Sequence, residues 1–148
     1  MSEEMPPEFW QGIEEFNQQQ FYACHDTLEA IWMEAVEPQK TFYQGILQIA
    51  VALYHLGNQN FRGAIILLGE GMNRLRHYQP SFAGIDVVQL LEQSRALQAN
   101  LQANLQASLQ AQEQRSSGSH QDLQGDLPSQ TSQPIPNLPQ IQRVVSES

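Results

Sequence analysis

The chain has 148 residues, a formal net charge of −9 and a single cysteine. An acidic surface repels phosphate groups, so nucleic acids and anionic membrane surfaces are disfavoured as partners. The lone Cys24 can form neither an intrachain disulfide nor a CxxC metal knuckle, and it fits a reducing cytoplasm.

The sequence also lacks the features that direct a chain into or across a membrane. Its first ten residues, MSEEMPPEFW, are acidic and have neither the basic start nor the apolar run of a secretory signal. The longest apolar stretch, ILQIAVALYHL, is about half the length that a membrane-spanning helix needs. We therefore expect a cytoplasmic protein with one helical domain at residues 6–94.

Two amphipathic helices are predicted at the start of this domain. The first covers residues 6–18, with Pro7 in the first turn, where proline is tolerated. The second covers residues 21–35, because apolar residues recur there at intervals of three and four. The buried stripe of this second helix is expected to contain Phe21, Cys24, His25, Leu28, Ile31, Trp32 and Ala35. A histidine thus falls among its apolar positions.

Two more helices are predicted at residues 41–58 and 61–78. The first of these is apolar nearly all round, which is typical of a central helix. Gly57 and Asn58 suit a left-handed cap at its end, and Asn60 is expected to cap the next helix. That helix contains glycines that weaken it relative to alanine and favour close approach of a neighbouring backbone. They are Gly63, Gly69 and Gly71.

The last third of the chain changes character. A fifth helix is predicted within residues 81–93, with Asp86 as its cap. Residues 95–115 carry leucine at every fourth position, a spacing that drifts about 40° per step around an α-helix. We therefore expect residues 95–115 to form an exposed helical extension that self-associates weakly. Residues 116–148 are rich in Ser, Gln and Pro, a composition that predicts a disordered tail.

The two helix pairs resemble each other at a spacing of forty residues. NQQQFYACHDTLEAIW aligns with GNQNFRGAIILLGEGM, and in this alignment His25 takes the place of Ile65 and Glu29 that of Gly69. Each copy is a helix, a polar turn and a second helix that begins with an aromatic residue, which is similar to a tetratricopeptide hairpin. We therefore predict an all-α fold, an array of about five helices in antiparallel hairpins.

His25, Asp26 and Glu29 are the candidates for chemistry. Glu29 follows His25 by four residues and Asp26 by three, so one helix brings the three side chains together. An imidazole and carboxylates can hold a divalent metal, with His25 and Glu29 as ligands and His55, at the end of the third helix, as another. The same residues also suit acid–base catalysis, with His25 as the base and Glu29 as the group that orients it.

A structural role is the stronger expectation from the residues alone. Glu29 can accept a hydrogen bond from His25, and Arg62 can pair with Asp26 or Glu29 across the hairpins, which would satisfy polar groups buried there. The neighbouring residues are expected to be packing anchors or to extend this polar network. They are Cys24, Trp32, Gln48 and Tyr54.

Three blocks of the sequence resemble a bacterial and archaeal family called domain of unknown function 309. They are FNQQQFYACHDTLEAIWMEA, FYQGILQIAVALYHLGNQNFRGAIILLGEGMNRL and GIDVVQLL, within residues 8–91. The family pattern has a His–acid pair, then Glu and Trp at steps of three, and a later QG and RGA. These fall on His25, Asp26, Glu29 and Trp32, on Gln44 and Gly45, and on Arg62, Gly63 and Ala64.

Two departures from the family pattern reduce the number of metal ligands. Ala23 stands where the family often has an acidic residue, and Asp26 stands where the family commonly has the longer Glu. This version of the motif is similar to the cyanobacterial branch of the family. The resemblance implies an all-helical array of about five helices and no established activity.

We expect a small helical domain that acts as a protein-interaction or small-ligand module and needs no cofactor. Its His/Asp/Glu cluster would lie at a helix–helix seam. The alternative is a metal-dependent or acid–base enzyme, hydrolase-like, centred on His25, Asp26 and Glu29 with His55 assisting. The expected partner is a protein or a small molecule, and a homo-oligomer through the apolar helices or residues 95–115 is a further expectation. The residues leave open whether the chain is an enzyme.

Overall fold

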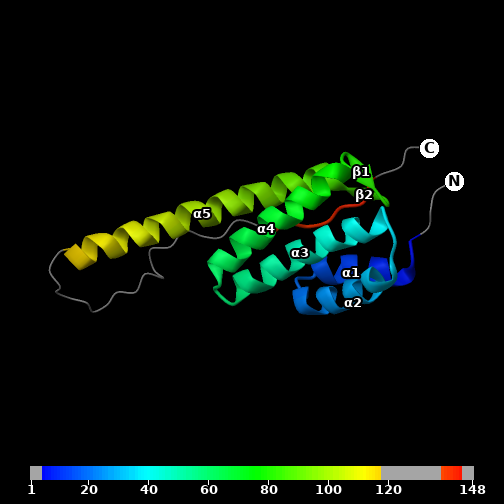
Figure 1. Ribbon diagram of the computed structural model, residues 1–148, viewed down its shortest axis with the longest axis horizontal. Helices are drawn as coiled ribbons and strands as arrows, with labels where there is room; N and C mark the ends of the chain where they lie inside the picture. The colour runs from blue at the N-terminus through cyan, green and yellow to red at the C-terminus, as the bar shows by residue number, and fades with distance from the viewer. Residues whose placement is uncertain (1–4, 118–137, 145–148) are drawn as a thin grey trace.

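The computed structural model describes residues 5–117 and 138–144 and has an all-α fold, as predicted. In chain order its elements are α1 (Pro7–Asn17), α2 (Phe21–Glu34), α3 (Gln39–Gly57), α4 (Phe61–Leu75), a 3₁₀ turn (Arg76–Tyr78), β1 (Ser81–Phe82), β2 (Ile85–Asp86) and α5 (Val87–Ser117). Helices α1 and α2 form one antiparallel hairpin and α3 and α4 form a second (Figure 1). The predicted array of about five helices is therefore confirmed.

Helix α3 is the centre of the array, because it packs against α2 on one side and α4 on the other. Its buried residues run from Phe42 to Leu56. Gly71 on α4 permits close approach to α3, since a Cβ at that position would lie 2.9 Å from the carbonyl oxygen of Gly45. The prediction that glycines of this helix allow close approach of a neighbouring backbone is therefore confirmed at Gly71.

The turns of the two hairpins repeat the same backbone geometry. Gln19 and Gln59 lie forty residues apart, and each has a φ of 65°. In each turn the residue that follows donates its N–H five residues back, from Gln20 to Glu15 and from Asn60 to His55. The left-handed residue of the second turn is thus Gln59, one position beyond the predicted Gly57–Asn58. Asn60 caps α4 as expected, because its side chain accepts a hydrogen bond from the Gly63 N–H at 3.0 Å.

A short hairpin precedes the fifth helix. Strands β1 and β2 pair antiparallel around a two-residue turn, Ala83 and Gly84, and both turn residues have positive φ. Helix α5 begins only at Val87. Asp86 caps it as predicted, accepting the Gln89 N–H at 3.0 Å.

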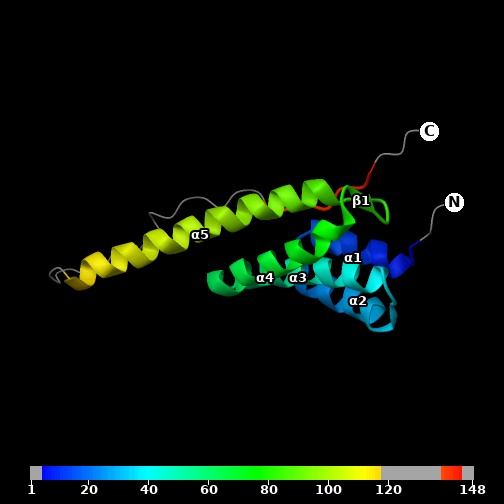
Figure 2. The ribbon, with the colours of Figure 1, turned by 45° about the horizontal axis from the view of Figure 1, so that its top comes forward.

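Helix α5 lies along α4 and then extends past it (Figure 2). The expectation that the leucine-rich residues are exposed is wrong for Leu97 and Leu101, which are 1% and 2% exposed. Leu109 is 43% exposed. The reason is that α5 packs on α4 near Gln98, whose side chain donates to the Ile65 carbonyl at 3.0 Å, and then extends past the rest of the fold.

Residues 138–144, here called the returning segment, come back to the first half of the molecule. Ile141 is 3% exposed, and the segment lies beside β2 and the end of α1. The predicted disordered tail is therefore wrong for these residues, which find partners far away in the sequence. The other tail residues, 118–137 and 145–148, lie outside the described residues.

No helix within the described ranges, 5–117 and 138–144, is both long and apolar enough to cross a membrane. The long helix α5 fails because its second half is rich in glutamine and alanine. This finding agrees with the absence of a membrane span in the sequence.

Candidate functional site

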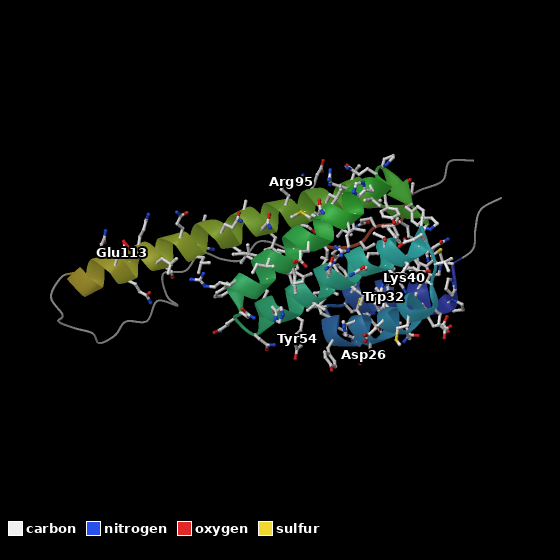
Figure 3. The ribbon with its side chains drawn as sticks, in the orientation of Figure 1. Asp26, Trp32, Lys40, Tyr54, Arg95 and Glu113 are labelled. Atoms are coloured by element: carbon white, nitrogen blue, oxygen red, sulfur yellow. The ribbon has the colours of Figure 1, made fainter. Side chains whose placement is uncertain are left out.

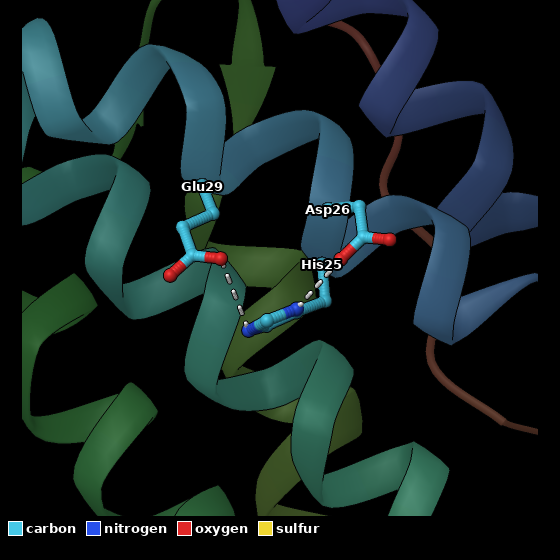
Figure 4. A group of neighbouring side chains, drawn as sticks. All are labelled: His25, Asp26 and Glu29. Atoms are coloured by element: carbon cyan, nitrogen blue, oxygen red, sulfur yellow. Dashed lines mark ion pairs between the residues drawn. The ribbon is translucent and has the colours of Figure 1, made fainter.

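The predicted cluster of His25, Asp26 and Glu29 forms on one face of α2 (Figure 4). Glu29 Oε1 lies 4.0 Å from His25 Nε2, and Asp26 Oδ1 lies 3.4 Å from His25 Nδ1. The side chains of His25, Asp26 and Glu29 are 32%, 62% and 46% exposed, so the cluster is open to solvent. Its place at a half-buried position of the helix explains why a histidine interrupts the apolar stripe.

The two carboxylates face opposite sides of the imidazole ring. Glu29 approaches one ring nitrogen and Asp26 the other, and the Asp26 contact lacks the alignment of a hydrogen bond. One ligand atom from each of the three residues can be chosen so that all lie within 4.8 Å of one another. In a tetrahedral zinc site with bonds of about 2.1 Å, neighbouring ligand atoms are about 3.4 Å apart. The cluster is therefore wider than a zinc site and would have to contract around an ion.

The cluster opens into a cleft between α2, α3 and α4 with a volume of about 190 Å³. We call it the polar cleft. Its lining combines polar side chains from α2 and α3 with apolar ones from α3 and α4: His25, Glu29, Trp32, Gln44, Leu47, Gln48, Val51 and Leu67. His25 and Glu29 thus line an open cleft, and the cluster is not sealed in the core.

Trp32 forms part of the wall of the polar cleft and also contacts Lys40, which is not among the lining residues. The Lys40 ammonium lies 4.3 Å from the centre of the indole ring and donates a hydrogen bond to the Trp32 carbonyl at 2.9 Å (Figure 3). A cation over an aromatic face is attractive, so the ring is positioned by a contact outside the cleft. The indole Nε1–H is buried and has no hydrogen-bond partner among the described residues.

Gln48 provides a second unsatisfied group at the same cleft. Its Nε2 donates to Glu70 Oε1 at 3.2 Å. Because a carboxylate only accepts, this bond fixes which end of the amide is the nitrogen. The other end, Oε1, is a buried acceptor without a partner. Five buried side-chain atoms lack partners in the described part of the chain, and those of His25, Trp32 and Gln48 belong to residues of this cleft.

Two residues predicted to join the cluster lie apart from it. His55 is not among the residues whose ligand atoms gather around His25, and its Nδ1 is 3.4 Å from Asn60 Nδ2 at the turn that follows α3. Arg62 is exposed, and within residues 5–117 and 138–144 it forms no ion pair with Asp26 or Glu29. The expected clasp across the hairpins is therefore not formed.

Cys24 is buried, as expected for a small core residue. Burial raises the pKa of its thiol to about 12, and the nearby Glu15 carboxylate adds to the shift. A thiol with so high a pKa is protonated near neutral pH and is a poor nucleophile or metal ligand. Cys24 therefore has no part in the chemistry of the polar cleft.

Part of the cleft wall is not predicted from the sequence. Gln44 stands out there only as part of a family pattern, and Leu47, Val51 and Leu67 do not differ from the other apolar residues of their helices. A signal was available, because Gln44 and Gln48 are four residues apart and so share one face of an otherwise apolar helix. A polar pair on the central helix needs an explanation, and the cleft supplies it.

Comparison with known proteins finds the same family over part of the chain. Residues 9–67 match the family model described as "Domain of unknown function (DUF309)". The chain is also 36% identical over 75 residues to "Uncharacterized protein YpuF" of Bacillus subtilis (strain 168). That alignment covers 49% of this chain and 43% of the relative, so the chain spans less than half of that protein. Every residue that lines the polar cleft lies within the family match.

Proposed function

We propose that this chain, whose residues 9–67 belong to the family called domain of unknown function 309, binds a small polar molecule in the polar cleft. The observation that carries the proposal is that two residues lining the cleft each hold a buried polar atom without a partner among the described residues. Trp32 offers a buried donor, and Gln48 offers a buried acceptor. Buried polar groups in proteins are nearly always paired, so two such groups in one cleft favour a ligand that pairs them.

The chemistry of the lining suggests the class of ligand. Trp32 Nε1–H needs an acceptor, whereas Gln48 Oε1 and the Glu29 carboxylate need donors. A primary carboxamide supplies both, through its carbonyl oxygen and its NH₂ group. The apolar side chains of the cleft, Leu47, Val51 and Leu67, favour a small apolar body attached to that amide.

Size and charge narrow the ligand further. A cavity of about 150 Å³ accommodates benzene, so the polar cleft, at about 190 Å³, suits a molecule slightly larger than benzene. Glu29 lines the cleft, Asp26 lies beside His25, and Glu70 accepts a hydrogen bond from Gln48. Like charges repel, so carboxylate and phosphate ligands are disfavoured.

Benzamide is a suitable first probe, and the two tryptophans make the test specific. In a ¹H–¹⁵N correlation spectrum we expect benzamide to shift the indole N–H signal of Trp32 and to leave that of Trp10 in place. Trp10 lies on α1 and is not part of the cleft. Benzoate, which has the same size and shape but carries a negative charge, is expected to bind more weakly.

Two variants serve as controls for this binding. Trp32→Phe removes the donor and Gln48→Leu removes the acceptor, and each is expected to weaken benzamide about fivefold in calorimetric titration, the worth of one hydrogen bond. Met33→Ala, at an exposed position of the same helix, should leave the affinity unchanged. Equal shifts of both indole signals, or equal affinity for benzamide and benzoate, would contradict the proposal.

A metal-dependent or acid–base enzyme centred on His25, Asp26 and Glu29 is the second candidate. The gathering of three ligand residues on one helix favours it. Zn²⁺ titrated into untagged protein would then bind one ion per chain, and His25→Ala would remove the binding while Asp26→Asn weakened it. Zn²⁺ binding that survives His25→Ala would dismiss this cluster as the metal site.

A further inference from the structure

The returning segment, residues 138–144, lies along the edge of the β1–β2 hairpin and is joined to it by one antiparallel bridge. Arg143 pairs antiparallel with Ile85. The Asp86 N–H donates to the Gln142 carbonyl at 2.8 Å, and the Val144 N–H donates to the Gly84 carbonyl at 2.9 Å. Addition of an extended peptide to a sheet edge is a recurrent mode of peptide recognition.

Two side chains of the folded domain hold the backbone of the segment. Asn17, the last residue of α1, accepts the Ile141 N–H at 2.7 Å and donates to the Ile141 carbonyl at 2.9 Å. Gln93 on α5 accepts the Gln140 N–H at 2.8 Å. These bonds do not depend on the side chains of the segment, so they supply affinity for an extended backbone.

The side chains of the segment supply specificity. Ile141 is 3% exposed and belongs to the main core, and Pro139 is also buried. The Arg143 guanidinium lies 3.7 Å from the centre of the Trp10 ring, within the range of a cation–π contact. The segment thus has Pro139, Ile141 and Arg143 at alternate positions. The first two are buried, and the third contacts the Trp10 ring.

We call the surface that receives the segment the docking groove. It is formed by residues from α1, the hairpin and the first turns of α5: Trp10, Asn17, Gly84, Ile85, Asp86 and Gln93. Three elements contribute to it. It is therefore built by the folded domain, and none of its residues belongs to the segment.

The covalent attachment of the segment starts far from the docking groove. Helix α5 runs from Gln93, beside the groove, to Ser117, a distance of about 36 Å at 1.5 Å per residue. Its far end extends past the rest of the fold (Figure 2). The chain between Ser117 and Leu138 can span at most about 70 Å. The segment can therefore reach its own groove, and it can equally reach the groove of a neighbouring copy.

We propose that the docking groove is a peptide-recognition site whose ligand is the returning segment of a second copy of this chain. In a single chain the segment fills its own groove. When two copies meet, each can give its segment to the other, because both arrangements form the same bonds. The attached segment competes at an effective concentration on the order of mM, so one chain keeps its own segment in dilute solution.

Two complementary variants of the full chain test the exchange. Asn17→Ala/Gln93→Ala keeps the segment and removes the side-chain clamps of the groove. Ile141→Asp/Arg143→Glu keeps the groove and disables the segment. Without the Asn17 and Gln93 side chains, the segment of the first variant is bound less tightly in its own groove. We therefore expect this segment to move to the intact groove of the second variant. Analytical ultracentrifugation should show a one-to-one complex in the mixture and monomers in each variant alone.

A peptide with the sequence of residues 136–146 provides a second measurement that needs only one variant. It should bind Ile141→Asp/Arg143→Glu at least about tenfold more tightly than the unaltered chain, whose own segment competes. The indole signal of Trp10 should shift on binding, while that of Trp32 should not. The same peptide with Ile141 replaced by Asp is the control and should not bind. Gln142→Ala in the full chain, at an exposed side chain, should behave as the unaltered chain.

The proposal is overturned if the mixed variants sediment only as monomers and the peptide also fails to bind the folded Ile141→Asp/Arg143→Glu chain. Equal peptide affinity for that variant and for the unaltered chain would overturn it as well, because the groove would then not be the binding site. Folding of each variant is checked by circular dichroism before either measurement.

Discussion

The polar cleft and the docking groove use similar side chains, but they differ in whether those side chains are satisfied. In the groove Asn17 both accepts from and donates to Ile141, and Gln93 accepts from Gln140. In the cleft, Gln48 uses only its nitrogen, and the indole N–H of Trp32 uses none of its capacity. One site is filled by the chain itself, and in the other two buried polar atoms have no partner among the described residues.

This difference separates two ways of recognising a binding site in a structure. A filled groove is recognised from contacts between residues far apart in the sequence. An unfilled cleft is recognised from buried polar atoms that have no hydrogen-bond partner, since such atoms are rare in folded proteins. The family match divides the molecule in the same way: it contains the whole polar cleft, whereas the returning segment and α5 lie outside it.

The largest predicted effect is a loss of stability from a substitution in the wall of the polar cleft, which leaves the residues of the docking groove unaltered. Leu47 is 7% exposed, belongs to the core and lines the cleft. Leu47→Ala should lower the free energy of unfolding by about 2–5 kcal/mol, the cost of removing a buried leucine side chain. Urea denaturation measures the loss. Leu109→Ala, at a position 43% exposed, should change stability by less than about 0.5 kcal/mol.

The next change acts on the groove alone. Ile141→Asp removes an apolar side chain whose burial contributes about 1.5–3 kcal/mol and places a charge where it sat. The loss cannot exceed the free energy of docking, because the segment can detach while the helices stay folded. Hydrogen exchange should show the amide of Val144 losing protection and the amides of α3 keeping it. Loss of protection throughout α3 would mean that the two regions are not independent.

A matched pair of substitutions compares the stability cost of removing a polar side chain whose hydrogen bonds are satisfied with that of removing one whose acceptor is not. Asn17→Ala leaves the N–H and carbonyl of Ile141 without partners and should cost about 1–3 kcal/mol. Gln48→Leu removes an acceptor that already lacks a partner and breaks one exposed bond, so it should cost less than about 0.5 kcal/mol. Equal costs in chemical denaturation would show that the cleft is satisfied in solution.

The smallest effect near neutral pH concerns Cys24, which belongs to neither site. Its folded-state pKa of about 12 lies above the ordinary value of 9.0, so its contribution is complete below pH 9 and is lost between pH 9 and pH 12. In that range the unfolded thiol releases its proton first, and stability should fall by up to about 1.4 kcal/mol per pH unit. Cys24→Ala should flatten the slope measured between pH 9 and pH 10. An equal slope in both proteins would assign the loss to other groups.

The sequence predicts the helices and the cluster well because both depend on short-range spacing. The periods of α1 to α4 and the capping by Asn60 and Asp86 follow from local chemistry. The meeting of His25 and Glu29 follows from the geometry of one helix. The exposure of the α2 face that carries His25 and Glu29 cannot be predicted from the sequence, because it depends on the position of α4.

The returning segment shows the opposite case. The tail to which it belongs, residues 116–148, is rich in Ser, Gln and Pro, so the local composition predicts disorder. The partners that order it are separated from it by most of the chain, since Asn17 and Ile141 lie 124 residues apart. Similarly, the leucine repeat predicts a helix but does not predict that Leu97 and Leu101 are buried. Long-range packing decides both outcomes.

The matched turns at Gln19 and Gln59 leave room for a more stable protein. A left-handed backbone is cheaper for glycine than for glutamine, and glycine is the residue that most often ends a helix in this conformation. Neither position belongs to the lining of the polar cleft or to the docking groove. Replacing both residues by glycine would give a scaffold with added thermal tolerance, on which destabilising variants of either site can be studied while the domain stays folded.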